Sequence, residues 1–470
     1  MLNKIKKALS WRVNYYTNKC NSIVFSKVTF IVDFIFTQYL FLSWQLNYKK
    51  ESLLRNKTRK PKLFWGIAPI LNNKYWSQAM KQIGYDSTTV METVYAINKK
   101  EDYDIYLEDI LKNLKGWKRN FLLFSRSHQT KMLLAFDYLI KNYDIVHIPF
   151  SGSFLGTTKY AQKEAELLKK FGIKIIALPY GSDAYIYSML KDTSLQHALL
   201  LSYPNGGKIS SIVQDRLNYW AKNVDCIAVG FQNEMPRWDL LAVNFISIDS
   251  VYWQKKVSYS ENNGINGIVT IIHTPNHKGF KGTEFIIKAI QELKEENLLI
   301  NFILVEKIPN SEVKRIMYEE ADILTEQLIA PAYALSAIEG MVSGLPVMAN
   351  LHSEVYTRHL RRYAYLNECP ILSTTPETIK DNLRILIKNP QLREELGRAG
   401  RKYVEKYHSY QTSQYMFGKI YDKIWYEKEV DLMNMFHPLM PDSYNNQSPK
   451  IEHPLVENKI PAALLATLNT

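Results

Sequence analysis

The chain has 470 residues, of which 46% are hydrophobic and 22% are charged, and its formal net charge is +13. This length exceeds one ordinary core and suits two domains with extensions, and the composition excludes a chain that is disordered throughout. The positive charge favours acidic partners, which are nucleic acid, anionic lipid or phosphorylated small molecules. The three cysteines lie far apart without a C-x-x-C pair, so they predict neither a disulfide framework nor a zinc site, and a reducing cytoplasm suits them best.

Residues 1–60 form a basic and aromatic extension that contains a long apolar run at 23–46. Lys27 and Asp33 interrupt this run, and each charge costs about 2.5–3.5 kcal/mol at the centre of a bilayer. Basic residues flank both ends, and the short apolar core and small-residue cleavage site of a signal peptide are not found. We expect a helical extension that lies on an anionic membrane surface. A membrane span and a packed structural helix pair are the alternatives.

From residue 61 the signals for strands and helices alternate. Apolar runs predict strands at 62–69, 143–150, 174–181, 224–230 and 245–249, and helical patterns occupy 72–85 and 157–173. This alternation predicts a parallel sheet covered by helices, and we assign it to a first Rossmann-like domain over 61–255.

A second cycle follows the polar, glycine-containing linker at 260–267. Strands are predicted at 267–275, 298–306, 321–329 and 345–350, with helices at 282–296, 311–320 and 333–344. We therefore expect an α/β protein with two doubly wound domains, the second over 256–426, and a ligand site in the cleft between them. The Pro- and Asn-rich tail at 427–470 is predicted to be mobile or loosely docked.

No G-x-G-x-x-G motif follows the first predicted strand, and no G-x-x-x-x-G-K-[ST] motif occurs, so dinucleotide oxidoreduction and P-loop phosphoryl transfer lack their main support. Lys278 and Lys281, however, lie in a glycine-containing turn that opens a predicted helix. Their ammonium groups and free helix N–H groups can converge on one phosphate. A solvated basic turn is the alternative.

Glu339 lies among small and apolar residues in the predicted helix 333–344. A carboxylate near the carboxyl edge of the sheet can accept two hydrogen bonds from a ribose diol. An exposed helix position is the ordinary alternative for a single glutamate. The lysine-bearing turn one cycle earlier favours the ribose interpretation, because both features then serve one phosphorylated ligand.

The stretch L-S-A-I-E-G-M-V-S-G-L-P-V-M-A at 335–349, preceded by K-G-T-E-F and followed by a closing L-G-R-A-G-R helix, resembles the C-terminal domain of family-4 glycosyltransferases of the GT-B fold. The resemblance covers residues 265–426 well and the first half more loosely. It implies that Lys281 contacts the diphosphate and Glu339 the ribose of a nucleotide-sugar donor. The donor-binding residues that it implies are Gly66, Lys278, Lys281, Tyr333, Leu335 and Glu339.

In the first half, the resemblance rests on D-I-V-H-I-P-F-S-G and P-Y-G-S-D. It implies catalytic roles for His147 and Asp183, and an acceptor-side loop at Ser151 and Gly152. A packed histidine at a strand end is the alternative for His147. Asp183 can equally cap the helix that follows it.

Two departures from the family pattern concern the donor site. The family usually has a first glutamate eight residues before the second, where this chain has Pro331, and an arginine five residues before the loop lysine, where it has Asn276. His277 or Lys278 can substitute for the arginine. An altered sugar preference and a loss of catalysis both explain these changes.

The resemblance implies a glycosyltransferase that uses a nucleotide-sugar donor and a glycan or lipid-linked acceptor at the cytoplasmic membrane face. We expect retention of configuration, no cofactor and no metal ion. The Asp-x-Asp spacing at 101–104 is typical of metal-dependent glycosyltransferases, but it starts a polar helix and is interpreted as solvated. An inactive GT-B scaffold of a glycan-assembly complex is the alternative, and nucleic-acid binding lacks any recognition motif.

Overall fold

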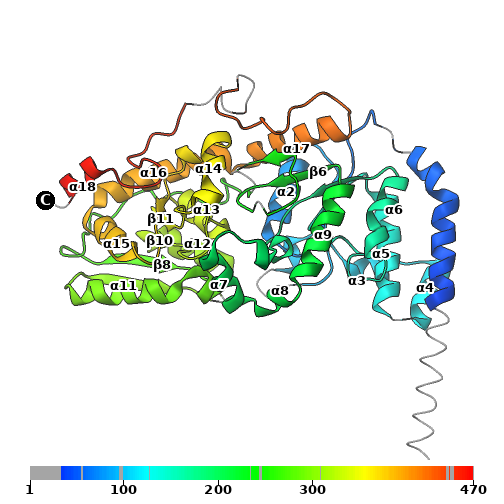
Figure 1. The fold of residues 1–470 in the computed structure, drawn as a ribbon, viewed down its shortest axis with the longest axis horizontal. Coiled ribbons are helices and arrows are strands. Elements are labelled where there is room, and N and C mark those ends of the chain that lie inside the picture. Colours follow the sequence, from blue (N-terminus) through cyan, green and yellow to red (C-terminus); the bar gives the residue numbers. More distant parts are fainter. Residues whose placement is uncertain are drawn as a thin grey trace, which may run out of the picture.

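The structure of the protein is a computed structural model that describes residues 33–53, 55, 57–94, 99–125, 127–232, 234–242, 246–306, 308–440, 444 and 449–468. Residues 1–32 of the predicted extension, and residue 245 of a predicted strand, lie outside the described residues. Figure 1 displays two sheets with their helices side by side along the long axis of the molecule.

The first domain is built on a parallel sheet of seven strands. In spatial order the strands are β3 (Ile105–Tyr106), β2 (Ser87–Met91), β1 (Leu63–Ile67), β4 (Ile145–Ile148), β5 (Lys174–Ala177), β6 (Cys226–Val229) and β7 (Leu240–Leu241). Its helices are α2 (Leu71–Gln82), α3 (Leu107–Lys112), α4 (Gly116–Phe124), α5 (His128–Asn142), α6 (Glu164–Lys170), α7 (Thr193–Ser202), α8 (Pro204–Lys208) and α9 (Ser210–Asn223).

The central strands of this sheet are buried along their whole length because helices cover both faces. Strands β2, β3 and β7 were not predicted: β2 reads S-T-T-V-M, and the other two have only two residues each, too few for a periodic signal. The prediction of a strand at 245–249 is wrong for residues 246–249, which the structure describes as non-regular chain.

The second domain has a parallel sheet of five strands. In spatial order they are β12 (Leu372–Ser373), β11 (Val347–Ala349), β10 (Ile323–Thr325), β8 (Val269–His273) and β9 (Ile300–Leu304). Its helices are α10 (Lys278–Lys281), α11 (Thr283–Glu295), α12 (Asn310–Glu319), α13 (Leu335–Ser343), α14 (Glu354–Tyr363), α15 (Ile379–Lys388) and α16 (Pro390–Tyr407). The predicted fold class, an α/β protein with two doubly wound Rossmann-like domains, is confirmed.

Helices α13 and α16 pack closely because glycines lie where they cross. A Cβ atom at Gly397 would come within 2.1 Å of the Gly344 carbonyl oxygen, and one at Gly400 within 3.2 Å of Met341. Next to them, Arg401 donates to the Trp253 and Val342 carbonyls at 2.6 and 2.8 Å. The L-G-R-A-G-R segment therefore joins α13, α16 and the linker between the domains.

Replacing Gly397 by alanine is expected to lower the free energy of unfolding by about 1–2 kcal/mol, because overpacking costs more than the gain in helix propensity. The control is Gly418→Ala on the later helix α17 (Tyr410–Ile424), where no atom lies within 4 Å of the new methyl group. That variant is expected to be at least as stable as the wild type. Urea unfolding measures both, and equal stabilities would contradict the assignment.

Helix α17 returns to the first domain. Phe417 packs edge-on against Trp65, with ring centroids 4.9 Å apart. The Tyr410 hydroxyl donates to Gln78 of α2 at 2.7 Å.

The described end of the tail, which includes α18 (Ala462–Leu468), packs on the second domain. The Ser373 amide donates to the Asn458 carbonyl at 2.8 Å. Residues 449–460 are thus firmly docked at the β12 edge, in contrast to the prediction of a mobile or loosely docked tail.

A helix over residues 33–53 packs on the outside of the first domain, against α4 and α5 (Figure 1). Phe36 stacks on Phe121 with centroids 3.6 Å apart, and Trp44 donates to Asp137 at 3.0 Å. Asp33, which interrupts the apolar run, accepts a hydrogen bond from Thr130 at 2.9 Å. One face of the described part of the extension is therefore structural, which agrees with the packed-helix alternative.

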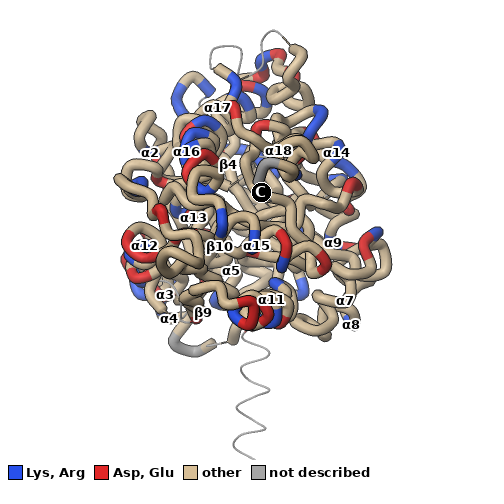
Figure 2. The backbone as a smooth tube through the Cα atoms, turned by 90° about the vertical axis from the view of Figure 1, so that its left-hand side faces the viewer, with Lys and Arg blue, Asp and Glu red and all other residues tan. Residues whose placement is uncertain are grey.

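Surface charges of both signs alternate on the second domain. Figure 2 displays lysines and arginines beside aspartates and glutamates along α11, α12 and α16. On α12, Arg315 pairs with Glu312 at 2.7 Å and with Glu319 at 2.9 Å. The positive net charge is thus partly balanced locally on these helices.

Candidate functional site

A cavity of about 560 Å³ lies between the two domains. Its walls are the loops after β1, β5 and β6 on one side, and α10 with the 327–334 loop on the other. Because these loops follow the carboxyl ends of parallel strands, the cavity has the usual position of a ligand site in such folds. The aromatic residues that line it are Tyr180, Tyr185, Tyr203, Phe231, Phe280 and Tyr333.

One end of the cleft is bridged by direct contacts between the domains. The ring of Tyr203, just after α7, lies 4.4 Å from the ring of His277, just before α10. The hydroxyl of Tyr356 on α14 donates to Glu234 of the first domain at 2.6 Å. These contacts bring the strand-end loops of the two domains toward the same cavity.

Lys281 lines the cleft at the end of α10, and its side chain is almost fully buried. Its ammonium group forms an ion pair with Glu326 and donates to the Gln327 amide oxygen at 2.8 Å. Ser336, in the first turn of α13, donates to the same oxygen of Glu326 at 2.8 Å. The cation is thus held beside the start of α13.

The start of α13 is available for an anion. The side chain of its N-cap residue, Ala334, makes no capping hydrogen bond, and Ala334 itself lines the cleft. The first N–H groups of a helix have no partner within the helix and carry partial positive charge. Helix α13 has nine residues, so its dipole adds to the field of Lys281 at this end of the cleft.

The loop that leads into α13 is shaped by Gln327. Its amide nitrogen donates to the Ala330 and Ala332 carbonyls at 3.2 and 3.0 Å. Ala332 has a φ of 84°, a left-handed conformation that favours glycine. Pro331, which stands where the family has its first glutamate, lines the cleft in this turn without offering a polar side chain.

Glu339 lies one turn after Ser336 on α13, and residues three apart on a helix are neighbours. Its carboxyl group accepts a hydrogen bond from Asn310, the first residue of α12, at 2.8 Å. Burial raises the pKa of Glu339 to about 7. Glu339 is not among the residues that line the cavity, but it adjoins the Lys281 cluster through α13.

No family model matches the chain, and no curated protein matches it. Among solved structures, it is similar to sucrose-phosphate synthase from Thermosynechococcus elongatus, with 12% identity and a TM-score of 0.48 over 79% of this chain and 100% of that chain. A UDP-N-acetylglucosamine 2-epimerase gives 14% identity and a TM-score of 0.41 over 79% and 98%. The catalytic domain of starch synthase IV from Arabidopsis thaliana, solved with ADP and acarbose, gives 11% and 0.40 over 78% and 100%. Identities and TM-scores this low decide neither the family nor the function.

The other predicted donor-side residues lie at the edge of this site. Lys278, the first residue of α10, is half-exposed and pairs with Glu306 at 3.0 Å. Tyr333 lines the cleft, and its hydroxyl lies 3.0 Å from Nε2 of His408. Leu335 opens α13. Tyr333 therefore lies at the cleft, Leu335 only follows the lining residue Ala334, and Lys278 points to a surface carboxylate.

His147 lies in the core of the first domain, away from the cleft. Its ring stacks on Trp65 with centroids 3.5 Å apart, and its nitrogens contact the Phe64 carbonyl at 3.0 Å and the Tyr421 hydroxyl at 2.9 Å. Burial lowers the pKa of His147 to about 3. Both ring nitrogens are engaged inside the fold, which is the packed strand-end alternative.

Asp183 joins two first-domain loops, of which the one after β5 borders the cleft. Its carboxyl oxygens accept from the amides of Phe150 and Tyr180, both at 2.9 Å. Burial raises the pKa of Asp183 to about 6 despite these hydrogen bonds. The carboxyl group thus ties the loop after β4 to the loop after β5, and its hydrogen bonds do not cap the segment that follows.

Ser151 and Gly152 belong to a tight loop that packs against Glu164. Gly152 has a φ of 85°, and a Cβ atom there would lie 2.8 Å from Glu164 Oε2. Glu164 is fully buried, accepts from the Ser153 amide at 2.8 Å, and has its pKa raised by burial to about 7.

At Gly66, a Cβ atom would lie 2.3 Å from the Val90 carbonyl. Gly66 therefore allows two strands to approach each other within the sheet.

The Asp-x-Asp segment at 101–104 is engaged in structural contacts. Asp102 pairs with Lys74 and Asp104 with Lys81, both at 2.6 Å. Over the described ranges, no three histidine, cysteine, aspartate or glutamate side chains gather where they could share a metal ion. The expectation that the reaction needs no metal ion stays a prediction.

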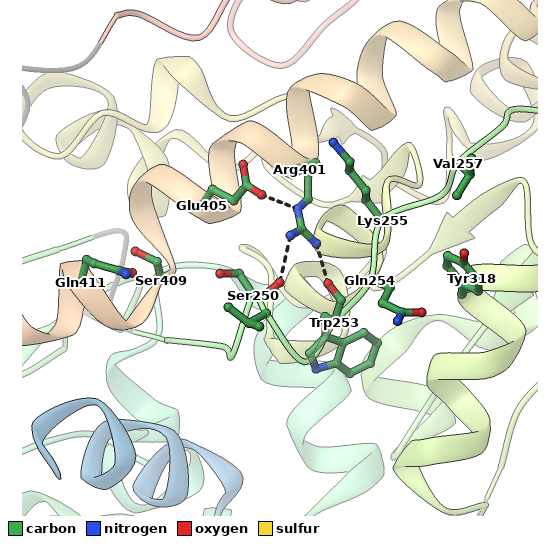
Figure 3. A pocket seen from close by; sticks show the side chains of 11 residues that line it. Ser250, Trp253, Gln254, Lys255, Val257, Tyr318, Arg401, Glu405, Ser409 and Gln411 are labelled. Carbon is green, nitrogen blue, oxygen red and sulfur yellow. Dashed lines mark hydrogen bonds and ion pairs between the residues drawn. The ribbon is translucent and has the colours of Figure 1, made fainter. Parts of the chain in front are cut away.

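A second cavity, of about 730 Å³, lies at the outer side of the domain junction around Arg401 (Figure 3). Figure 3 displays the guanidinium of Arg401 directed at Ser250, Trp253 and Glu405. This cation is already used to hold the linker. We therefore assign the ligand site to the smaller cleft at the strand ends.

Sequence reasoning missed Glu326, Gln327 and the aromatic lining of the first domain. The signal for the first two was present: an acidic and an amide residue directly after the short strand β10. The predicted strand at 321–329 was too long and concealed them, since only 323–325 form a strand. The aromatic residues come from several loops, which no local pattern connects.

Proposed function

We propose that the protein is a glycosyltransferase that moves a sugar from a nucleotide-sugar donor to a glycan or lipid-linked acceptor, with retention of configuration and without a metal ion. The observation that carries this proposal is the cluster at the cleft, where Lys281 and the uncapped start of α13 adjoin Glu339. A cation and free helix N–H groups suit a diphosphate, and a neighbouring carboxylate suits a ribose.

In the proposed reaction, the bond between the anomeric carbon and the diphosphate oxygen breaks, and that oxygen keeps the electron pair. An acceptor hydroxyl forms the new bond, and its proton leaves with the departing diphosphate. Negative charge grows on the leaving group, so Lys281 and the first N–H groups of α13 stabilise the transition state more than the ground state. No protein general base is needed for this step.

The first domain contributes the acceptor side in this proposal. Tyr180, Tyr185 and Phe231 face the same cavity as Lys281. Aromatic side chains with a few polar groups are the common lining of small-ligand sites. Asp183 then acts as a positioning residue, because its hydrogen bonds fix the loop after β5, which carries Tyr180 and Tyr185.

The test is the release of nucleoside diphosphate from a panel of UDP-, GDP- and ADP-sugars, with and without lipid extracts as acceptor. Turnover with at least one donor supports the enzyme. Nucleotide binding without turnover under every condition would support the inactive scaffold instead, for which the replacement of the usual first glutamate by Pro331 is the favouring observation. Failure to bind any nucleotide would overturn both.

We further propose that the enzyme works on the anionic cytoplasmic face of a membrane. The helix over 33–53 has one face packed on the protein, and its opposite face exposes an apolar row with helical spacing. The row is Ile35, Tyr39, Leu42, Leu46 and Leu53. Exposed Lys49 and Lys50 accompany it, which suits anionic headgroups. Among the described helices, none is both long and apolar enough to cross a bilayer.

The double variant Leu42→Ser and Leu46→Ser is expected to weaken binding to anionic vesicles about tenfold or more, since each buried leucine contributes about 1.5–3 kcal/mol. Co-sedimentation with phosphatidylglycerol-containing vesicles measures this. The matched control is Val251→Ser with Val257→Ser, two exposed residues at the domain junction. Equal binding by both double variants would contradict the proposed membrane face.

A further inference from the structure

The cation of the proposed donor site is already neutralised inside the protein. Glu326 follows β10 directly, and its side chain is completely buried against Lys281, which is itself 6% exposed. The same carboxyl oxygen also accepts from Ser336 in the first turn of α13. Glu326 is therefore bound to both elements that would hold a donor diphosphate.

The rest of Glu326 is poorly compensated. Its second oxygen, Oε2, is buried and has no hydrogen-bond partner. A buried carboxylate normally has all its lone pairs occupied, because desolvation is otherwise costly. This carboxylate is thus held mainly by contacts that a phosphate could take over.

Other described groups near α10 do not restore a positive charge. Lys278 pairs with Glu306 at the surface, and burial, together with the charge of Lys281, lowers the pKa of His277. A diphosphate that enters the cleft therefore meets one cation with its own counter-ion. Like charges separated by a few ångströms repel strongly when they are partly shielded from water.

We propose that Glu326 is an internal competitor for Lys281: the donor diphosphate takes the ammonium group from Glu326 on binding, and Glu326 takes it back when the nucleoside diphosphate leaves. This inference rests on the proposed function and adds a role for a residue outside the family pattern given above. Glu326 acts through Lys281 and is a positioning residue. Its consequence is faster product release, at the cost of affinity for the nucleotide.

The inference predicts an unusual direction of change in nucleotide affinity for Glu326→Gln. A partner that only supports the structure should weaken nucleotide binding when it is changed. An internal competitor should strengthen it, because Gln leaves Lys281 as a buried cation that the phosphate then compensates. We expect a Kd for nucleoside diphosphate about tenfold lower than that of the wild type. Steady-state kcat should fall through slow product release, while the single-turnover rate should not.

The experiment is calorimetric titration of the full-length wild type and Glu326→Gln with UDP, GDP and ADP, together with thermal unfolding in the absence of nucleotide. The matched control is Glu306→Gln, which removes the counter-ion of the surface lysine on the same helix and should leave the Kd unchanged. Tighter binding by Glu326→Gln alone supports the inference. Unchanged or weaker binding by Glu326→Gln, with a wild type that binds, would overturn the inference and leave the proposed function intact.

A wild type that binds no nucleotide would overturn the proposed function and this inference with it. If Glu326→Gln fails to fold, Glu326→Asp replaces it. Asp keeps the charge but is one methylene shorter, so its grip on Lys281 is weaker. Nucleotide should then bind more tightly than to the wild type, although by less than for Gln. Weaker binding by Glu326→Asp would contradict the competition.

Discussion

Lys281→Met is expected to lower kcat for sugar transfer about 1000-fold and to weaken nucleoside diphosphate binding, because it removes the only lysine or arginine in the described lining of the cleft. Methionine keeps the length and apolar contacts of the lysine stem. The loss therefore reports the charge and its hydrogen bonds. Initial rates of nucleoside diphosphate release and calorimetric titration measure the two effects.

The control for this variant must separate folding from function. Lys281→Met leaves Glu326 as an unpaired buried carboxylate, which costs about 3–5 kcal/mol of stability. The double variant Lys281→Met with Glu326→Gln removes both charges and should recover the thermal stability but not the activity. Lys288→Met, an exposed residue on α11, should change neither. Full activity in the folded double variant would rule out a diphosphate role for Lys281.

Glu339→Gln is expected to weaken nucleoside diphosphate binding about 30-fold at pH 8, because two charge-assisted hydrogen bonds to the ribose become neutral ones. Inorganic pyrophosphate has no ribose, so its affinity should be the same for the variant and the wild type. That comparison separates a ribose contact from a general distortion of the site. An equal loss for pyrophosphate would contradict the ribose assignment.

The same residue predicts the pH dependence of binding. Burial raises the pKa of Glu339 to about 7, and the ribose requires the ionised form. Below pH 7 the carboxyl group must lose its proton to bind, so the wild-type Kd at pH 6 should be about tenfold higher than at pH 8 from this group alone. Glu339→Gln removes this component, and the difference between the two pH profiles cancels the titration of the ligand.

The raised pKa of Glu339 makes the stability of the ligand-free protein change with pH in the opposite direction. The native state holds the proton of Glu339 up to about pH 7, whereas the unfolded chain releases it near pH 4.3. The stability that this proton contributes is complete at low pH and is lost as the pH rises toward 7. Nucleotide binding and ligand-free stability should therefore respond to pH in opposite directions over this interval.

The alternation of apolar strands and amphipathic helices was readable from the sequence, since each element buries a continuous run or a stripe against its neighbours. This is why β1, β4, β5 and β8 were predicted. The strands that were not predicted are β3, β7 and β12, which have two residues each, and β2, with its polar start. Their strand character comes from pairing with a neighbouring strand, β2 with β1, β3 with β2, β7 with β6 and β12 with β11, and pairing is not a property of a local window.

The residues of the candidate site were likewise predicted correctly only in part. Lys281 and Tyr333 were predicted and line the cleft, because strand-end turns of a parallel sheet gather at one edge by construction. His147 also ends a strand, yet α17 returns from the far end of the chain and covers it with Tyr421. No sequence pattern near residue 147 predicts a hydrogen-bond partner that lies 274 positions later in the chain.

What the sequence by itself determined is the set of elements and their order, because hydrophobic period and turn residues act over a few positions. Only the tertiary structure decided which polar groups meet. It paired Lys281 with Glu326, joined Asp183 to two loops, and placed one face of the 33–53 helix against α5 while leaving the other exposed. The physical reason is that charge compensation and desolvation depend on distances between segments, which packing sets.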